Sequence, residues 1–228
     1  MRNLRMHWRR FRNLQELVYH GVRIGTVPGE IPKSVRSALF KGTYEDYECR
    51  LVERCVKPGD RVLEIGTGIG VVSLLATRLA GEGNVLSCEA NPALEPVIRA
   101  NYARNGWQPE LLMTAVTADG RDLSFHQNDN LLTSSAHDRS LAGTAITVPS
   151  TPIDTLIARH RPSVLVMDVE GSETELLPAA DLSGIASIIV EMHPHIVGED
   201  AIAELGAKLQ ARGLREAARQ HKTCLLVR

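Results

Sequence analysis

Apolar and polar positions alternate along this chain in blocks, most regularly from residue 61 onward. Short apolar runs, each long enough for one strand, recur between stretches with helical spacing. The predicted strands are RVLEIG, NVLSCEA, ELLMTAV, TAITVP, SVLVMD and IASIIVEM, and the predicted helices between them are residues 71–80, 93–104, 152–159 and 201–212. Strands that alternate with helices at this spacing predict a doubly wound, Rossmann-like α/β fold with a mostly parallel sheet.

The two ends of the chain depart from this alternation. LREAARQ and TCLLVR close the chain as an expected antiparallel strand pair, and GTYEDYE leads into a helix over residues 44–55. Residues 1–20 place apolar side chains on one side of a predicted helix and arginines on another. This helix packs on its own domain or on the mate in a homodimer, or it lies on a membrane surface or a partner protein. We expect a helical extension over residues 1–58 and one domain over residues 59–228.

Composition narrows the class of protein. The 228 residues carry a net charge of −1, and 23% of them are charged, which gives no overall nucleic-acid signature. The four cysteines show no CxxC spacing, so we expect reduced thiols without a disulfide or a zinc site. Apolar runs fall short of the roughly 18 residues that a membrane span requires. We therefore expect a cytoplasmic protein without stable membrane insertion.

A glycine-rich loop follows the first predicted strand of the alternating part. VLEIGTGIG places Gly66, Gly68 and Gly70 where the backbone can approach a ligand at a helix N-terminus. Glu89 ends the next strand, where a carboxylate can bind both ribose hydroxyls, unless it is simply solvated. These features fit either a dinucleotide or an adenosyl cofactor. Glu64, beside the glycine turn, favours the second, because it would repel a pyrophosphate and attract an ammonium or sulfonium group.

Several motifs together resemble one family, the FkbM-type methyltransferases. They are GTYEDYE, E-x-G-x-G-x-G, CEANP, TPIDTL, VMDVEGSE and VEMHPH, spread over residues 40–195. The resemblance implies a class I methyltransferase fold with S-adenosyl-L-methionine as cofactor. It also implies a set of cofactor-binding positions: Glu64, Gly66, Thr67, Gly68, Gly70, Glu89, Ala90, Ala115 and Asp168. The chain departs from the family at Thr67-Gly68, where an Ala-Asn pair is common, and at Val166, where a lysine is common.

VLVMDVEGSE begins as a buried strand and ends in a group of acids. Because carboxylates are costly to bury, we expect Asp168 and Glu170 at the carboxyl edge of the sheet, where such folds bind ligands. We expect Glu173 to cap a helix that starts near Ser172, or to be solvated.

VEMHPH adds Glu191, His193 and His195 at alternating positions, which place them on one side of an extended strand. Three interpretations stay open: His193 is a general base, the histidine and the acids bind a divalent metal, or the segment is a plain polar strand end. We take His193, Asp168 and Glu170 as the catalytic residues, with His193 as the base and no metal.

The expected activity is methyl transfer from S-adenosyl-L-methionine to a hydroxyl of a saccharide or secondary metabolite. The alternatives are an NAD-dependent oxidoreductase and a cofactor-binding module without catalysis. The polar stretch over residues 126–143 is a candidate for acceptor contacts, through Asn128, Asn130, Ser134, Ser135 and His137.

Overall fold

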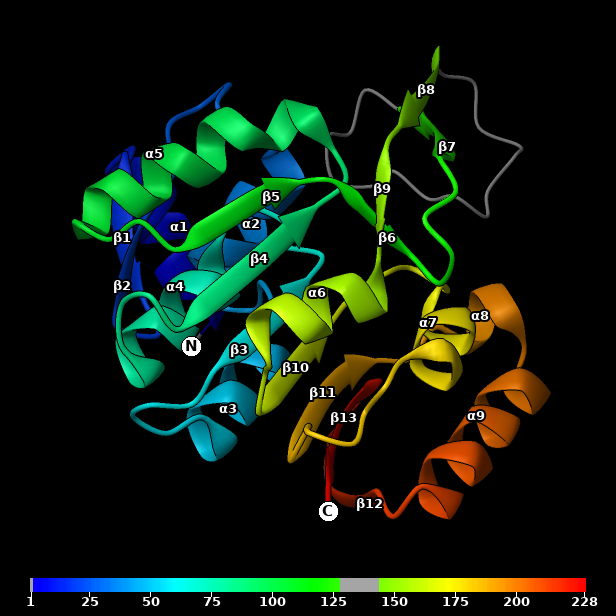
Figure 1. The fold of residues 1–228 in the computed structure, drawn as a ribbon. Helices are drawn as coiled ribbons and strands as arrows, with labels where there is room; N and C mark the ends of the chain where they lie inside the picture. The colour runs from blue at the N-terminus through cyan, green and yellow to red at the C-terminus, as the bar shows by residue number, and fades with distance from the viewer. Residues whose placement is uncertain (1, 128–143) are drawn as a thin grey trace.

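The computed structural model describes residues 2–127 and 144–228, and their centre is a seven-stranded sheet (Figure 1). Its strands are β3 (Val62–Ile65), β4 (Val85–Glu89), β5 (Glu110–Met113), β10 (Val164–Met167), β11 (Ser187–Glu191), β12 (Arg215–Gln220) and β13 (Thr223–Val227). Their order is β12-β13-β11-β10-β3-β4-β5. Neighbouring strands from β11 to β5 pair in parallel, and β13 pairs antiparallel with both β11 and β12. The predicted doubly wound sheet with an antiparallel C-terminal pair is confirmed.

Helices cover both faces of this sheet (Figure 1). On one face, α3 (Asp46–Cys55), α4 (Val71–Ala80) and α5 (Glu95–Asn105) share an apolar cluster with the sheet. On the other face, α6 (Ile153–His160), α7 (Glu173–Ala179) and α9 (Glu199–Ala211) share a second cluster. The strands are therefore buried on both sides, as their nearly continuous apolar runs require.

The order of the strands reverses at β3, which lies between β10 and β4. The chain leaves β3 toward β4 and β5, and it returns to the other side of β3 for β10 and β11 (Figure 1). A crevice opens at the carboxyl ends of the strands at such a switch point. The glycine loop after β3 and the acids after β10 both lie at this edge.

The N-terminal segment differs from the predicted single helix over residues 1–20. Helix α1 (Arg2–Phe11) ends early, and β1 (Glu16–Tyr19) and β2 (Val22–Gly25) form an antiparallel hairpin. His20 and Gly21 both have positive φ, 46° and 78°, as a tight two-residue hairpin turn requires. The alternating burial of β1 shows that its apolar residues follow a strand period, which the helical interpretation missed.

On α1 itself, the apolar side chains divide between the interior and the surface. Met6 is buried, whereas 54% of Trp8 and 89% of Phe11 is exposed. More than half of each aromatic side chain is therefore exposed, although Arg12 lies over the Trp8 ring, 5.3 Å from its centre. In the same segment, α2 (Lys33–Lys41) was not predicted, and it packs against α1.

Other elements differ from prediction in their boundaries or partners. ELLMTAV splits into β5 and β6 (Ala115–Thr117), and β6 pairs with β9 (Ser150–Pro152) outside the central sheet. TAITVP forms β8 (Thr144–Val148), which pairs with β7 (Leu123–Gln127). The proposed acceptor residues from Asn128 to His137 lie outside the described residues. Among the residues that the structure describes, no helix is both long and apolar enough to cross a membrane.

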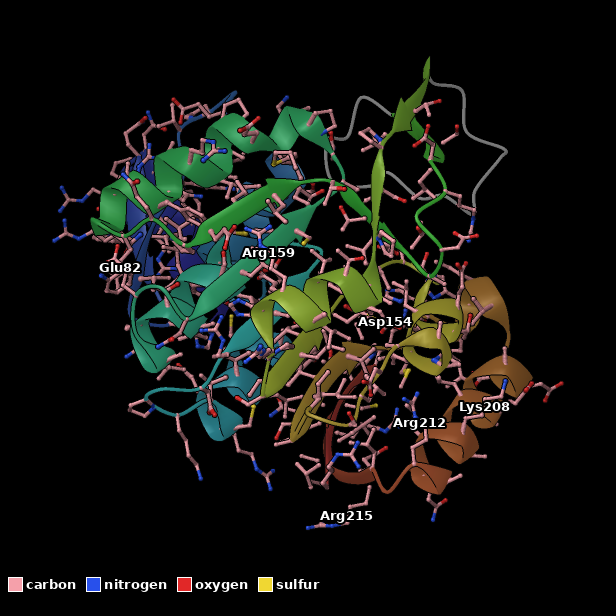
Figure 2. The ribbon with its side chains drawn as sticks, viewed as in Figure 1. Glu82, Asp154, Arg159, Lys208, Arg212 and Arg215 are labelled. Atoms are coloured by element: carbon pink, nitrogen blue, oxygen red, sulfur yellow. The ribbon has the colours of Figure 1, made fainter. Side chains whose placement is uncertain are left out.

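An arginine joins two helices on the second face of the sheet. Figure 2 shows Arg212 just past the end of α9, and its guanidinium donates to the carbonyl oxygens of Leu177 and Ala180 at 2.9 Å and 2.6 Å. These carbonyls belong to the end of α7, where helical acceptors are left without partners. The contact ties the C-terminal end of α7 to the end of α9.

Candidate active site

The glycine loop brings β3 and β10 into close backbone contact. Gly66 has a φ of +90°, and a Cβ at this position would lie 1.9 Å from the carbonyl oxygen of Asp168. Only glycine fits so close to a neighbouring backbone. The amide of Asp168 in turn donates to Ile65 O at 3.0 Å. The loop and the acidic segment are therefore locked together at the switch point.

Glu89, at the end of β4, supports the same loop from the other side. Its carboxylate accepts hydrogen bonds from the amides of Gly68 at 3.0 Å and Asn91 at 2.8 Å. Burial raises the pKa of Glu89, although these backbone donors counteract the shift. Glu89 also lines a cavity over the loop, where a ligand hydroxyl can approach its carboxylate. The alternative of a solvated strand-end acid is wrong, because Glu89 is 8% exposed.

A cavity of about 310 Å³ lies over this loop. Its wall holds most of the positions expected to bind the cofactor: Gly66, Gly68, Glu89, Ala90, Ala115 and Asp168. Glu170 also lines it. Thr67 and Gly70 do not line it; the Thr67 hydroxyl donates to Glu64 at 3.1 Å, and Gly70 is the N-cap of α4. These two residues stabilise the conformation of the glycine loop without lining the main cavity.

Glu64 lies beneath the loop, in the wall of a second, much smaller cavity. Burial raises its pKa to about 7, although the hydrogen bond from the Thr67 hydroxyl opposes the shift. Val166, where the family commonly has lysine, lies in the same wall and contributes no charge. This small cavity is therefore walled by carboxyl groups without a lysine to neutralise them.

The acids of VLVMDVEGSE emerge at the cavity as predicted, and a histidine lies behind them. Asp168 Oδ1 lies 3.5 Å and Glu170 Oε2 lies 3.6 Å from His193 Nε2. Glu191 is also near this nitrogen, at 3.9 Å. His193 is only 3% exposed and does not line the main cavity. The structure thus brings the three predicted catalytic residues together. Asp168 and Glu170 line the main cavity, and His193 lies behind them.

Glu173 holds this arrangement from the interior. It is fully buried, and it accepts hydrogen bonds from the amides of Gly171 at 2.9 Å and His193 at 2.7 Å. It also lies 3.4 Å from His193 Nδ1, so the other ring nitrogen turns toward the acids. The expectation that Glu173 caps its helix or is solvated is wrong. The residue instead ties the turn after β10 to the end of β11.

The protonation of the acid–histidine group follows from these contacts. Burial alone lowers the pKa of His193, but the nearby charges of Glu173, Asp168 and Glu170 outweigh it and raise the pKa to about 8. Burial, with the charges of Glu191 and Glu170, raises the pKa of Asp168. The ligand atoms of Asp168, Glu170 and His193 lie within 4.8 Å of one another, a spacing that a divalent metal tolerates. The same three residues therefore form a proton-accepting group and a candidate metal site.

Two residues at the cavity had no predicted role, Tyr44 and Glu45. Both line the main cavity, and a Cβ on Gly68 would lie 2.9 Å from the Tyr44 hydroxyl and from Glu45 Oε1. They belong to GTYEDYE, which was quoted only as a family motif. Their distance along the chain from the glycine loop hid the contact, because α3 folds back onto α4.

The walls of the two cavities fit S-adenosyl-L-methionine. The main cavity combines apolar side chains such as Leu94 and Val116 with the carboxylate of Glu89, as an adenine ring and a ribose require. Buried oxygens of Glu45, Glu64 and Asp168 have no hydrogen-bond partner. Such atoms are costly without a donor or a cation, and the cofactor carries both an ammonium and a sulfonium group.

Curated relatives match parts of this chain. The ribosomal protein L11 methyltransferase of Thermus thermophilus is 34% identical over 93 residues, which are 39% of this chain and 36% of the relative. The enzyme of the same name from Chloroflexus aurantiacus is 30% identical over 174 residues, 74% of this chain and 47% of the relative. The chain thus matches less than half the length of these two curated relatives.

A solved structure and a family model complete the comparison. The ribosomal protein L11 methylase of Lactobacillus delbrueckii subsp. bulgaricus superposes with a TM-score of 0.46 at 18% identity, covering 79% of this chain and 76% of that chain. The model of the methyltransferase FkbM domain matches residues 64–216. The chain therefore belongs to the FkbM methyltransferase domain family, and S-adenosyl-L-methionine is its cofactor.

Proposed function

We propose that this methyltransferase transfers the methyl group to a hydroxyl oxygen of a saccharide or secondary metabolite. The cofactor supplies a methyl group that is already activated on a sulfonium. The chain's own residues then have to hold the acceptor oxygen in line with that methyl and take up the hydroxyl proton. The observation that carries the proposal is the acid–histidine group, Asp168, Glu170 and His193, at the wall of the cofactor cavity.

We infer a role for each member of this group from its position. Asp168 lines the cavity, so it contacts the acceptor hydroxyl and receives its proton as the oxygen–carbon bond forms and the carbon–sulfur bond breaks. His193 Nε2, 3.5 Å from Asp168 Oδ1, then holds the proton. Glu173 Oε1 lies 3.4 Å from Nδ1, so its negative charge stabilises the protonated ring. Glu170 accepts hydrogen bonds from other hydroxyls of the acceptor.

The test of the proposed reaction is transfer of an isotopically labelled methyl group to a panel of hydroxylated acceptors, saccharides included. We expect label on oxygen in at least one acceptor. In that assay His193→Ala should lower kcat by about 10²–10⁴, the usual effect of losing a general base. The affinity for S-adenosylhomocysteine should stay unchanged in calorimetry. His195→Ala is the matched control, because His195 is exposed and its ring centre lies 5.8 Å away.

Two outcomes would contradict the assigned roles. Near-normal turnover of His193→Ala would end its role as the final proton acceptor. Loss of activity in a chelator, restored by a divalent ion, would show that Asp168, Glu170 and His193 hold a metal instead. We expect the chelator to have no effect.

A second candidate acceptor is a basic protein side chain. The curated relatives are named for methylation of a ribosomal protein, and the carboxyl groups at this cavity would attract a positive charge. The same label-transfer assay with purified ribosomal protein L11 separates the two candidates. Label on the protein, with none on hydroxylated acceptors, would replace the first proposal.

A further inference from the structure

Two aromatic rings stack on each other at the surface, those of Tyr47 and His221, and the proposed chemistry uses neither. Tyr47 belongs to α3, and His221 lies in the turn between β12 and β13. Their ring centres are 5.7 Å apart and their planes differ by 10°, which is an offset parallel stack. Tyr47 is nevertheless 45% exposed, and His221 is exposed as well. The pair therefore presents aromatic surface to solvent.

The stacked pair lies at the same edge of the sheet as the cofactor cavity. Glu191, the last residue of β11, pairs in register with Thr223, the first residue of β13. The turn that holds His221 directly precedes Thr223, so it lies at the carboxyl end of β11. Glu48 accepts a hydrogen bond from the Thr223 hydroxyl, and this contact holds α3, with Tyr47, against the turn.

Carboxylates lie between the stacked pair and the place of methyl transfer. β10, β11 and β13 are neighbours in that order, so their ends follow one another along the edge. His193 Nε2, behind this edge, lies 3.5 Å from Asp168 and 3.9 Å from Glu191. The side chains of Glu170 and Glu191 are 48% and 27% exposed. A ligand that extends from Asp168 along the edge therefore meets hydrogen-bond acceptors and then aromatic rings.

This series of groups suits a sugar ring. The hydroxyls at the rim of a pyranose donate to carboxylates, and the C–H groups on its flat face pack against the negative face of an aromatic ring. A basic side chain also packs on aromatic faces. Lys222, however, follows His221 in the turn, and its positive charge acts on Glu191. A second cation beside it would be repelled, whereas a neutral ring would not.

We propose that Tyr47 and His221 form a subsite that binds a pyranose ring of the acceptor saccharide. The inference rests on the proposed methylation of a hydroxyl, and it names the part of the acceptor that the enzyme recognises. The reacting hydroxyl lies at Asp168, and further hydroxyls of the saccharide donate to Glu170 and Glu191. Tyr47 thus determines which acceptors bind, and it touches none of the reacting atoms.

The test measures acceptor kinetics in the label-transfer assay, with the methyl glycosides of glucose, galactose, mannose and rhamnose as probes. Tyr47→Ala should raise KM for the glycoside that the wild type methylates best by about 5-fold to 50-fold, as expected for the loss of an aromatic contact. Its kcat should fall by less than about threefold, because the methyl-transfer geometry is kept. Tyr47→Phe keeps the ring and should retain KM within about twofold.

Further variants separate a binding role from a structural one. His221→Asn removes the second ring, and asparagine tolerates the left-handed φ of 57° at this turn, so KM should rise by a few-fold in a folded protein. Phe11→Ala is the matched control, because it removes an exposed ring that does not line the cofactor cavity. It should leave KM unchanged. All these variants should bind S-adenosylhomocysteine in calorimetry as tightly as the wild type does.

The outcomes separate this inference from the proposed function. An unchanged KM in Tyr47→Ala, or label only on hydroxylated acceptors without a sugar ring, would overturn the subsite and leave hydroxyl methylation intact. Label on no hydroxylated acceptor would overturn both. Weaker binding of S-adenosylhomocysteine to Tyr47→Ala would show that the stacked pair shapes the cofactor site instead. Methylation of ribosomal protein L11 that is lost in Tyr47→Ala would assign the pair to a basic protein side chain.

Discussion

At the scale of single residues, acids at the carboxyl ends of the parallel strands form much of the polar wall of the cofactor cavity. The strand ends placed Glu89 and Asp168 at the ligand edge, because parallel strands end together there. Glu173 was misjudged, since its two amide donors, Gly171 and His193, come from different strand ends that a local pattern cannot bring together. Glu45 was missed because Gly68, which it approaches in the glycine loop, is distant from it along the chain. Contacts between distant segments decide the fine structure of this site.

The first residue-scale prediction concerns the ribose. Glu89→Ala should weaken S-adenosylhomocysteine binding by about 1.5–3 kcal/mol, the range for hydrogen bonds to a charged group. The variant also leaves the amides of Gly68 and Asn91 without their acceptor, which adds to the loss. Isothermal titration calorimetry measures it directly, and an unchanged affinity would exclude Glu89 from the cofactor site.

The second residue-scale prediction concerns pH. His193 must be neutral to take up a proton, and its pKa is raised from 6.5 to about 8. The protonated form therefore dominates at pH 7, and kcat/KM should rise with pH through about 8 before it levels off. A profile of kcat/KM from pH 6 to 9.5 checks this, and the rise should vanish in His193→Ala. A profile already flat above pH 6.5 would contradict the coupled Asp168–His193 acceptor.

At the scale of elements, periodicity predicted the central sheet well and the N-terminus poorly. The helix over residues 71–80 matches α4, and the strands on both sides of it match β3 and β4. Fully buried strands give continuous apolar runs. Such runs are readily identified as strands when turns rich in glycine and charged residues lie on both sides of them. Residues 1–20 contain both a helix and a strand, and apolar residues in a short segment fit either period. The hairpin turn at His20-Gly21 was the missed signal.

The element-scale prediction concerns the contact between the turn after β10 and the end of β11. Glu173→Ala leaves two buried amides unsatisfied, and each such loss costs about 1–3 kcal/mol. We expect the free energy of unfolding in urea to fall by several kcal/mol. Glu175→Ala is the control, because Glu175 lies on the same helix α7 but pairs with Arg121 at a more exposed position. Equal stability of the two variants would show that Glu173 is not a structural link.

At the scale of the whole molecule, the N-terminal helix is the part whose role is open. Met6 is buried and α1 packs on α2, yet Trp8 and Phe11 face outward. The boundary between an extension over residues 1–58 and a domain from residue 59 stays a prediction. The apolar cluster on the first face of the sheet includes residues from both sides of that boundary, such as Leu39 and Val62.

The whole-molecule prediction is a truncation that spares the β1–β2 hairpin. Deleting residues 1–11 should lower the melting temperature or alter the oligomeric state, because it removes Met6 and exposes α2. The affinity for S-adenosylhomocysteine should stay within about twofold, since the cofactor cavity is built from other elements. Light scattering measures the oligomeric state, and calorimetry measures the melting temperature and the affinity. A truncated protein with unchanged mass and stability that has lost binding to anionic liposomes would instead assign α1 to a membrane surface.

The central claim is that the switch point of the sheet binds the cofactor in one defined orientation. A crystal structure of the protein with S-adenosylhomocysteine tests it most directly. We predict the ribose hydroxyls on Glu89, the ammonium group between Glu45 and Glu64, and the sulfur facing Asp168. A nucleoside bound outside this cavity, or one inside it with its ammonium turned away from Glu45 and Glu64, would contradict the account.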